Sequence, residues 1–314
     1  MARAHRGSRC RPLLRRVSVV ADAVVDTARQ GLGPVGVCLP VSLTSPTPFE
    51  SQRAAVGRLG RAGYRAVWTN EVIGKDALVQ LAMLLAATDR TVFGTCIANI
   101  WARPAQTMHA AAAQLAEAHP GRFVLGLGVG YPQQAASVTR DFGSPLATMR
   151  DYLETMGEPT WPPAPDAAFP RVIAANGPKM LDLAAKFADG AMPAMLPVES
   201  TKEARRALGP DKLLVVALSV IAEAGAAREA VANRLGVPSY AQRLRALGYS
   251  DRDIAEVSDG LVNAIVAQGD PGVVAARVNE HIAAGADHVI LLPPIGAEFA
   301  TAVEDLERVV MAHR

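Results

Sequence analysis

The sequence predicts a single (β/α)8 barrel, the TIM-barrel architecture, and three observations lead to this prediction. Eight short apolar runs alternate with helix-length segments along most of the 314 residues, which is typical of a parallel sheet with helices outside it. The runs are apolar throughout rather than at every second residue, as expected of strands buried on both faces. Half of the chain is apolar, which is enough for a large core. A doubly wound sheet is the alternative, but its GxGxxG fingerprint is absent, because GLGVGY has a different spacing.

The stretch from Thr91 to Tyr131 shows the repeating unit most clearly. An apolar run, Thr91–Ile97, is followed by a helix that starts near Pro104. The helix ends at His119-Pro120-Gly121, and a second apolar run, Phe123–Val129, follows at once. Two parallel strands need such a crossover helix, so the stretch is predicted to be a βαβ unit. The second run breaks into glycines, which allow another group to approach the backbone closely.

The remaining elements follow the same pattern, with glycine or proline at most of their boundaries. The strands are marked by Val35, Ala66, Val92, Phe123, Val172, Ala191, Leu214 and Val289. The other helices are predicted at 49–61, 76–88, 145–156, 180–188, 199–208, 226–235, 271–284 and 297–311. The proline-rich stretch Pro159–Pro170 is predicted to lack regular structure, because proline cannot donate a backbone hydrogen bond.

The chain divides into three parts. Residues 1–33 are predicted to be a basic extension, disordered or loosely packed, in which Val17–Gln30 has the pattern of a short amphipathic helix broken by Gly31 and Gly33. Residues 34–314 are predicted to form the barrel. Within it, Val237–Gln268 is helical, more polar than the rest, and interrupts the alternation as an insertion before the last helix and strand. The insertion is expected either to cover the barrel mouth or to join a homodimer interface, and the sequence leaves both open.

Composition excludes several classes of function. The net charge is +2, so no nucleic-acid partner is expected. No apolar stretch has the length of a membrane span, and Asp22 interrupts the run after Arg15-Arg16 that a signal peptide would need. The cysteines and histidines lack the spacing of metal ligands. We therefore expect a metal-free cytoplasmic protein that acts on a small molecule.

A barrel carries its site at the carboxyl ends of its strands. These ends hold no histidine, no cysteine with an adjacent base and no close pair of carboxylates, so hydrolysis by a triad or a metal is not expected. Glycines, amides and apolar side chains suit instead a bulky planar cofactor that brings its own chemistry. The strand ends are Leu39-Pro40, Asn70-Glu71, Ala98-Asn99, Gly128–Tyr131, Asn176–Lys179, Met192–Ala194, Glu223 and Pro293-Pro294.

The turn Asn176-Gly177-Pro178-Lys179 has the sequence of a helix start, with asparagine as a cap and proline in the first turn. The free N–H groups of such a start bind anions, and Lys179 would add a positive charge. The turn is therefore a candidate phosphate site, although the same sequence also begins ordinary helices.

Five side chains near the strand ends have both a functional and a structural interpretation. Glu71 is either an acid/base group or an acid that caps a helix or pairs with Lys75. Asn70 and Asn99 either hold cofactor carbonyls or satisfy loop backbone. Trp101 is a stacking platform or a rim aromatic, and Tyr131 closes the pocket or lies on the surface.

The chain resembles the luciferase-like monooxygenase superfamily, and within it the actinobacterial oxidoreductases that use the deazaflavin coenzyme F420. The segments that carry the resemblance are AGYRAVWTNEVIGKDAL, GTCIANIWARPAQTM, LAEAHPGRFVLGLGVGY, PLATMRDYL, PRVIAANGPKMLDLAAKFADGAMP and GDPGVVAARVNEHIAAGADHVIL. Together they extend from about Val35 to Leu292.

The resemblance implies a site at the barrel mouth. It implies a non-proline cis peptide at Cys96-Ile97 behind the cofactor ring, and the cofactor phosphate near Gly177-Pro178-Lys179. The residues that it implies around the ring are Ala98, Asn99, Gly128, Val129 and Gly130.

Two departures from the family pattern bear on the reaction. Relatives that oxidise sugar phosphates carry an Asp-His pair after the second strand, where this chain has Glu71-Val72, and an acid where it has Val129. Oxidation of glucose 6-phosphate is therefore disfavoured. The resemblance implies hydride transfer between F420 and an unidentified small organic substrate, with Glu71 as the candidate catalytic residue. The alternatives are an FMN-dependent monooxygenase that uses molecular oxygen, and a ligand-binding barrel without catalysis.

Overall fold

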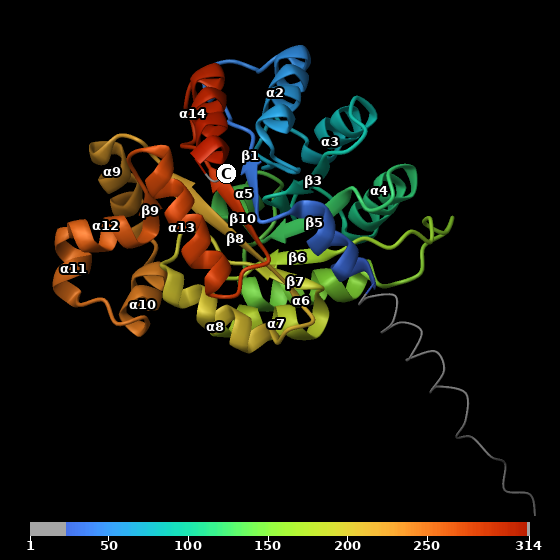
Figure 1. The fold of residues 1–314 in the computed structure, drawn as a ribbon. Coiled ribbons are helices and arrows are strands. Elements are labelled where there is room, and N and C mark those ends of the chain that lie inside the picture. Colours follow the sequence, from blue (N-terminus) through green and yellow to red (C-terminus); the bar gives the residue numbers. More distant parts are fainter. Residues whose placement is uncertain (1–22, 313–314) are drawn as a thin grey trace, which may run out of the picture.

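The structure is a computed structural model that describes residues 23–312, and its centre is a closed parallel barrel (Figure 1). Each strand pairs in parallel with its neighbours, and β10 pairs with both β1 and β8, which closes the ring. The predicted barrel and its eight strands are confirmed. These strands are β1 (Val35–Cys38), β2 (Ala66–Thr69), β3 (Val92–Thr95), β5 (Phe123–Gly128), β6 (Arg171–Ala174), β7 (Gly190–Met192), β8 (Leu213–Val220) and β10 (His288–Leu292).

Two short strands lie beside the barrel ends. β4 (Ala98–Asn99) pairs with the end of β5, and β9 (Val266–Ala267) pairs with the end of β8. Both join the carboxyl ends of the barrel strands, so they extend the wall at the side where the site was predicted.

Helices surround the strands in Figure 1 and lie close to the predicted segments. Helix starts follow ordinary capping rules: Ser144 caps α6 and Asp270 caps α13, each before a proline in the first turn. The stretch 157–170 has no regular structure, as predicted. The helices around the barrel are α2 (Phe49–Ala62), α3 (Ala77–Ala86), α4 (Ala105–Ala118), α5 (Pro132–Ala136), α6 (Pro145–Met156), α7 (Pro178–Phe187), α8 (Val198–Leu208), α13 (Pro271–Ala283) and α14 (Phe299–Ala312).

The barrel interior is filled by side chains, and Trp68 of β2 is the largest of them. Its indole is fully buried, and its Nε1–H donates to Nε2 of His288 at 3.0 Å. Gly94 of β3 makes the space, because a Cβ there would lie 2.3 Å from the indole ring. Trp68 therefore lies inside the barrel and not at the mouth.

The segment 23–32 forms a helix that covers the amino-terminal end of the barrel. Val25, Ala28 and Leu32 are buried against residues that begin the barrel strands. The prediction of a disordered or loosely packed extension is thus wrong for this segment, because its apolar face closes the barrel. The rest of the predicted extension, residues 1–22, lies outside the described residues.

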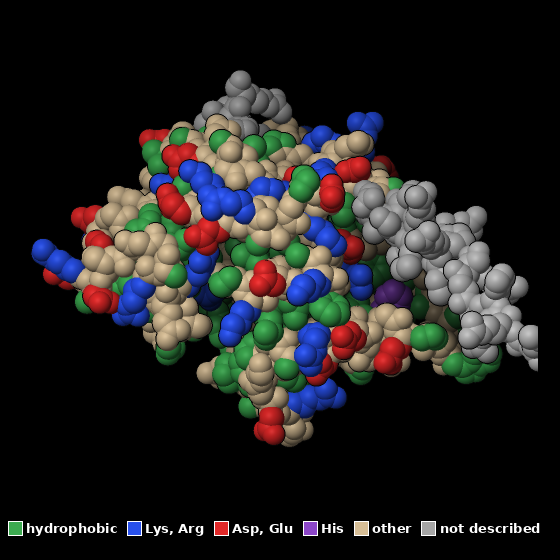
Figure 2. Space-filling view, turned by 90° about the horizontal axis from the view of Figure 1, so that it is seen from below, with side chains coloured by type: hydrophobic (Ala, Val, Ile, Leu, Met, Phe, Trp, Pro, Cys, Tyr) green, Lys and Arg blue, Asp and Glu red, His purple; other side chains and the backbone are tan. Residues whose placement is uncertain are grey.

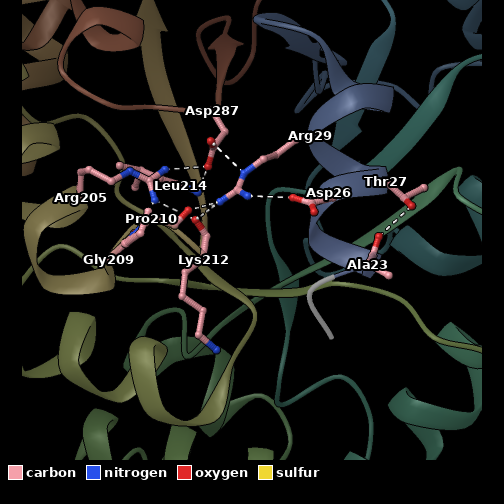
Figure 3. Close-up of polar contacts among 10 residues, drawn as sticks. All are labelled: Ala23, Asp26, Thr27, Arg29, Arg205, Gly209, Pro210, Lys212, Leu214 and Asp287. Atoms are coloured by element: carbon pink, nitrogen blue, oxygen red, sulfur yellow. Dashed lines mark hydrogen bonds and ion pairs between the residues drawn. The ribbon is translucent and has the colours of Figure 1, made fainter. Parts of the chain in front are cut away.

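An ion-pair network fixes this helix (Figure 3). Asp287, just before β10, accepts from Arg29 of the helix at 3.1 Å and from Arg205 of α8 at 2.7 Å. Its carboxylate also accepts the N–H of Leu214 at 2.7 Å. One partly buried acid therefore ties three segments together at the end of the barrel opposite the site.

The insertion begins at α9, earlier than the predicted Val237. It comprises α9 (Ala224–Leu235), α10 (Pro238–Ala246), α11 (Asp251–Glu256) and α12 (Asp259–Ile265), which project beside the ring in Figure 1. The four helices share a small apolar core that includes Val231, Leu244 and Leu261. The insertion is thus a packed unit, and α9 belongs to it because its buried residues face that core.

The surface in Figure 2 shows basic and acidic side chains interspersed, without a single large basic area on that face. None of the helices in the described part of the chain combines the length and apolarity that crossing a bilayer requires. Among the same residues, no group of three or more His, Cys, Asp or Glu side chains could hold a metal ion.

Candidate active site

The end of β2 and the segment after β3 are joined by two backbone hydrogen bonds. The N–H of Cys96 donates to the carbonyl of Thr69 at 2.7 Å, and the N–H of Glu71 donates to the carbonyl of Ile97 at 3.0 Å. Asn70 lies between these two bonds and therefore beside the Cys96–Ile97 peptide. That peptide is cis, as the resemblance implied.

The next part of the wall is formed by β4 and the end of β5. Ala98 pairs with Leu127, and Asn99 pairs with Gly128. A Cβ on Gly128 would lie 1.9 Å from Cδ1 of Ile97, so only glycine allows this approach without a shift. Ile97, Ala98, Asn99 and Gly128 thus pack together as one part of the barrel wall, in which Ala98, Asn99 and Gly128 are buried.

Trp101 and Asn99 stabilise the loop beside this part of the wall. The indole Nε1–H of Trp101 donates to the carbonyl of Val129 at 2.7 Å, and its backbone N–H donates to Oδ1 of Asn99 at 3.0 Å. Asn99 therefore satisfies loop backbone with its side-chain oxygen, which was one of the two interpretations. Gly130 has a positive φ of 65° and begins the turn to Tyr131.

Tyr131 connects the barrel to the insertion. Its ring is about half exposed, and its hydroxyl accepts a hydrogen bond from Arg234 of α9. The guanidinium of Arg234 also lies 5.3 Å from the ring centre of Tyr240 in α10. The insertion therefore contacts the barrel at the residue that follows the loop after β5.

Glu71 is nearly buried, and both of its carboxylate oxygens are occupied. One accepts from Arg103 at 2.7 Å and from the N–H of Ala77 at 3.2 Å. The other accepts the N–H of Asn99 at 2.8 Å. These contacts agree with the structural interpretation of Glu71, but the partner is Arg103 rather than the expected Lys75.

Lys75 lies at the end of β2 instead of pairing with Glu71. Its ammonium donates to Oγ1 of Thr69 at 2.7 Å and to Oδ1 of Asn70 at 3.0 Å. Burial lowers its pKa, and the nearby Cys38 and Glu71 oppose that shift. The contacts of Lys75 with Thr69 and Asn70 could not be predicted from the sequence, because no residue spacing marks a single lysine in a loop as part of a site.

The thiols of Cys38 and Cys96 lie next to each other, near Lys75. A hydrogen bond between the Cys38 and Cys96 side chains lowers the pKa of Cys38 and raises the pKa of Cys96. Cys38 is buried, and Cys96 is partly buried. Their proximity could not be predicted, because 57 intervening residues separate them in the chain.

The predicted phosphate turn lies at the end of β6, beside β5. Asn176 does not cap α7: its side chain accepts from the N–H of Ala194 at 2.9 Å and donates to the carbonyl of the same residue at 3.2 Å. Gly177 is the cap and makes no side-chain bond, and a Cβ there would meet open space. Pro178 opens the helix and Lys179 is exposed in its first turn. Pro178 has no N–H, and the N–H of Met180 donates to the carbonyl of Gly177 at 3.1 Å. Within this turn the N–H of Lys179 is therefore the candidate donor to an anion.

The structure therefore brings the predicted residues to one end of the barrel, but several of them make contacts other than those expected from the sequence. The wall at Cys96–Asn99 and Gly128 and the open start of α7 belong to neighbouring strands, because β5 pairs with β6. Asn176 and Glu71 support this arrangement through backbone contacts. This end of the barrel therefore combines a largely buried wall of small and apolar residues with the start of α7 on the neighbouring strand.

Comparison with known proteins identifies a family that matches most of the chain. The sequence profile of the luciferase-like monooxygenase family matches residues 34–288. A protein of Mycobacterium tuberculosis, provisionally named a coenzyme F420-dependent oxidoreductase, is 28% identical over 178 residues. The match covers 46% of this chain and 51% of that protein, so the similarity spans about half the length of each.

Solved structures share the fold at low sequence identity. An F420-dependent secondary alcohol dehydrogenase, in complex with an F420-acetone adduct, has a TM-score of 0.68 at 17% identity and covers 90% of this chain and 99% of its own. The F420-dependent tetrahydromethanopterin reductase of Methanopyrus kandleri has a TM-score of 0.64 at 18% identity, covering 89% and 98%. The oxygenating constituent of 3,6-diketocamphane monooxygenase from Pseudomonas putida, in complex with FMN, has a TM-score of 0.64 at 14% identity, covering 89% and 97%.

The profile match extends over most of the barrel, and the fold and the wall of the mouth agree with it. The chain therefore belongs to the luciferase-like monooxygenase family.

Proposed function

We propose that this protein is an oxidoreductase that uses coenzyme F420 and transfers a hydride between the deazaflavin and a small organic substrate. One observation carries the proposal: the wall at Cys96–Asn99 and Gly128 lies on the strand next to the open start of α7. A tricyclic ring with a phosphate-bearing side chain needs these two features side by side.

The residues present fit such a cofactor. Ala98, Gly128 and Val129 are buried and carry no polar side chain, so the wall behind the ring would be apolar. Gly177 leaves open space at the helix start, where a side chain would otherwise hinder an anion. The backbone N–H and the exposed ammonium of Lys179, at the positive end of α7, would hold the phosphate.

Deazaflavin supplies hydride chemistry when bound, so the protein needs to position and shield rather than to activate. In this proposal Asn70 and Asn99 hold polar groups of the ring or substrate, and Trp101 and Tyr131 line the substrate pocket. Glu71 acts as a positioning residue, because both of its oxygens already bind the protein. The insertion excludes water on the side where Arg234 meets Tyr131.

Two relatives support F420 over other cofactors. The Mycobacterium protein and the secondary alcohol dehydrogenase are both named as F420-dependent. The FMN complex of the diketocamphane monooxygenase keeps an FMN-dependent monooxygenase as the alternative. A barrel that binds a ligand without catalysis is the third candidate. The proposal includes a cytoplasmic location and a small-molecule substrate, and it leaves a homodimer as one arrangement to be measured by light scattering.

The test is a calorimetric titration of the purified full chain with F420 and, separately, with FMN. Tight binding of F420 and weak binding of FMN are expected. Tight binding of FMN alone, with oxygen consumption by the reduced protein, would favour the monooxygenase. Binding of neither cofactor would contradict the proposal.

A further inference from the structure

A groove of ≈ 580 Å³ adjoins the barrel mouth between two loops, 40–47 after β1 and 72–76 after β2. Four large apolar side chains with high exposure line it: Leu43 at 71%, Ile73 at 77%, Val79 at 56% and Met83 at 44%. Exposed apolar groups gathered around one concave surface indicate a binding site rather than ordinary surface.

Only two charged side chains line this groove, Lys75 and Asp76. Asp76 is already engaged, because one oxygen accepts the N–H of Val79 at 2.9 Å and the other pairs with Arg103. Lys75 has three N–H donors, and two of them bind Thr69 and Asn70. The third has no hydrogen-bond acceptor among residues 23–312. Lys75 is therefore the charge that remains available to a ligand.

The position of Lys75 links the groove to the candidate cofactor surface. Its ammonium lies 3.0 Å from Oδ1 of Asn70, and Asn70 lies beside the Cys96–Ile97 peptide through the two backbone bonds described above. A molecule with its apolar part in the groove would therefore present its polar end next to that surface.

We propose that Lys75 and this groove form the substrate subsite, which takes an apolar organic molecule that carries a carboxylate or carbonyl oxygen. The oxygen accepts the free N–H of Lys75, and the apolar part lies against Leu43, Ile73, Val79 and Met83. This subsite rests on the proposed function for its role in catalysis, but its binding chemistry does not depend on which cofactor is used.

The charges around Lys75 set how binding depends on pH. Cys38 and Glu71 lie near the ammonium and raise its pKa, Asp76 follows it in the chain, and burial lowers the pKa with the larger effect. Only the protonated amine attracts a carboxylate. Affinity for a carboxylate is therefore expected to fall as the pH rises and the amine loses its proton, and this loss is expected at a lower pH than for an ordinary lysine, whose pKa is 10.5.

The test uses two probes with the same apolar tail, octanoate and octyltrimethylammonium, titrated into the full chain with and without F420. Octanoate is expected to bind and the cation to bind weakly. Lys75→Met is expected to weaken octanoate about tenfold and to leave the cation unchanged, because it removes one charge-assisted hydrogen bond. Lys75→Arg keeps the charge and should retain binding, and Lys202→Met, an exposed lysine of α8, is the matched control.

A second measurement needs no variant. Acetic anhydride labels accessible amines, and octanoate should protect Lys75 but not Lys202, as read by mass spectrometry of the peptides. Unchanged octanoate affinity in Lys75→Met, or protection of other lysines instead, would overturn the subsite. Lys75-dependent octanoate binding without F420 binding would remove the proposed function and keep the subsite, while the reverse result would remove only the subsite.

Discussion

Arg103, just before α4, donates a 2.7 Å charge-assisted hydrogen bond to Glu71 at the end of β2. The two side chains are 13% and 6% exposed, so the pair is largely shielded from water. The second oxygen of Glu71 holds the N–H of Asn99, so this pair fixes β4 against the end of β2. The acid that the sequence offered as a catalytic group is thus part of the support beneath the site.

Replacing Glu71 by Gln should therefore lower stability. The amide keeps one acceptor but places an N–H against donors that now bind a carboxylate, and Arg103 loses its most buried partner. We expect a loss on the order of 2 kcal/mol in the free energy of unfolding, measured with urea. Glu117→Gln, an exposed acid of α4, is the control. Unchanged stability would show that these contacts contribute little.

Gly177 offers a way to separate helix capping from anion binding. Asp and Asn are both better caps than glycine, so Gly177→Asp and Gly177→Asn should each preserve or slightly raise stability. Only Asp brings a negative charge to the start of α7, where a phosphate would bind. Gly177→Asp should therefore weaken F420 binding at least tenfold in calorimetry, while Gly177→Asn should have a much smaller effect. Equal affinities for the two variants would place the phosphate elsewhere.

The contact between Tyr131 and Arg234 joins the mouth to the insertion. Tyr131→Phe removes the hydroxyl that accepts from Arg234 and leaves the ring in place. Because the contact is partly exposed, stability should change by less than about 0.5 kcal/mol. The dissociation rate of F420, measured by stopped-flow fluorescence, should nevertheless rise several-fold if the insertion covers the site. Tyr249→Phe, elsewhere in the insertion, should leave that rate unchanged.

Much of the fold could be predicted because it follows from local patterns. The eight strands appear as apolar runs, and glycine, proline and capping residues mark most helix ends. These patterns also predicted a helix within Val17–Gln30, which overlaps the observed helix at 23–32, but not that it is packed against the barrel, because tertiary contacts decide that. The helix at 23–32 is ordered by burying Leu32 under the barrel and by the bond from Arg29 to Asp287, and neither partner lies near it in the chain.

The sequence predicted which residues lie at the carboxyl ends of the strands, and therefore near the site, but not the contacts that each of them makes. Side-chain direction decides what each residue does there, and the sequence leaves it open. Asn176 binds Ala194 rather than capping α7, and Glu71 selects Arg103 although Lys75 is closer in sequence. Trp68 enters the barrel because Gly94 leaves room on the next strand, which only the register of β2 with β3 shows.

Two glycines of similar appearance should respond differently to alanine. A Cβ on Gly126 would lie 1.9 Å from the carbonyl oxygen of Thr95, a backbone atom that cannot move aside, while Gly177 faces open space. Gly126→Ala should therefore cost about 3 kcal/mol of stability or prevent folding, as expected for overpacking against a rigid neighbour. Gly177→Ala should cost only a few tenths of a kcal/mol. Thermal unfolding followed by circular dichroism distinguishes the two.

Two buried histidines should make stability fall in mild acid. Burial lowers the pKa of His281 and of His288 to about 4. In His288 the Nε2 atom accepts from Trp68 and therefore cannot carry a proton, so Nδ1–H donates to the carbonyl of Gly33. Both rings are neutral in the folded protein at neutral pH.

The sign of the effect follows from proton binding. Well above pH 6.5 neither the folded nor the unfolded state binds a proton at these rings. Protonation of the two histidines therefore takes nothing from the free energy of unfolding in this range. Between pH 6.5 and about 4 only the unfolded histidines are protonated, so stability falls as the pH decreases. Each ring should cost about 2 kcal/mol at pH 5 relative to pH 7.5. Urea unfolding at the two pH values measures the difference, and His281→Leu should reduce it by about half. An equal pH dependence in the variant and the parent would show that His281 does not titrate in this range.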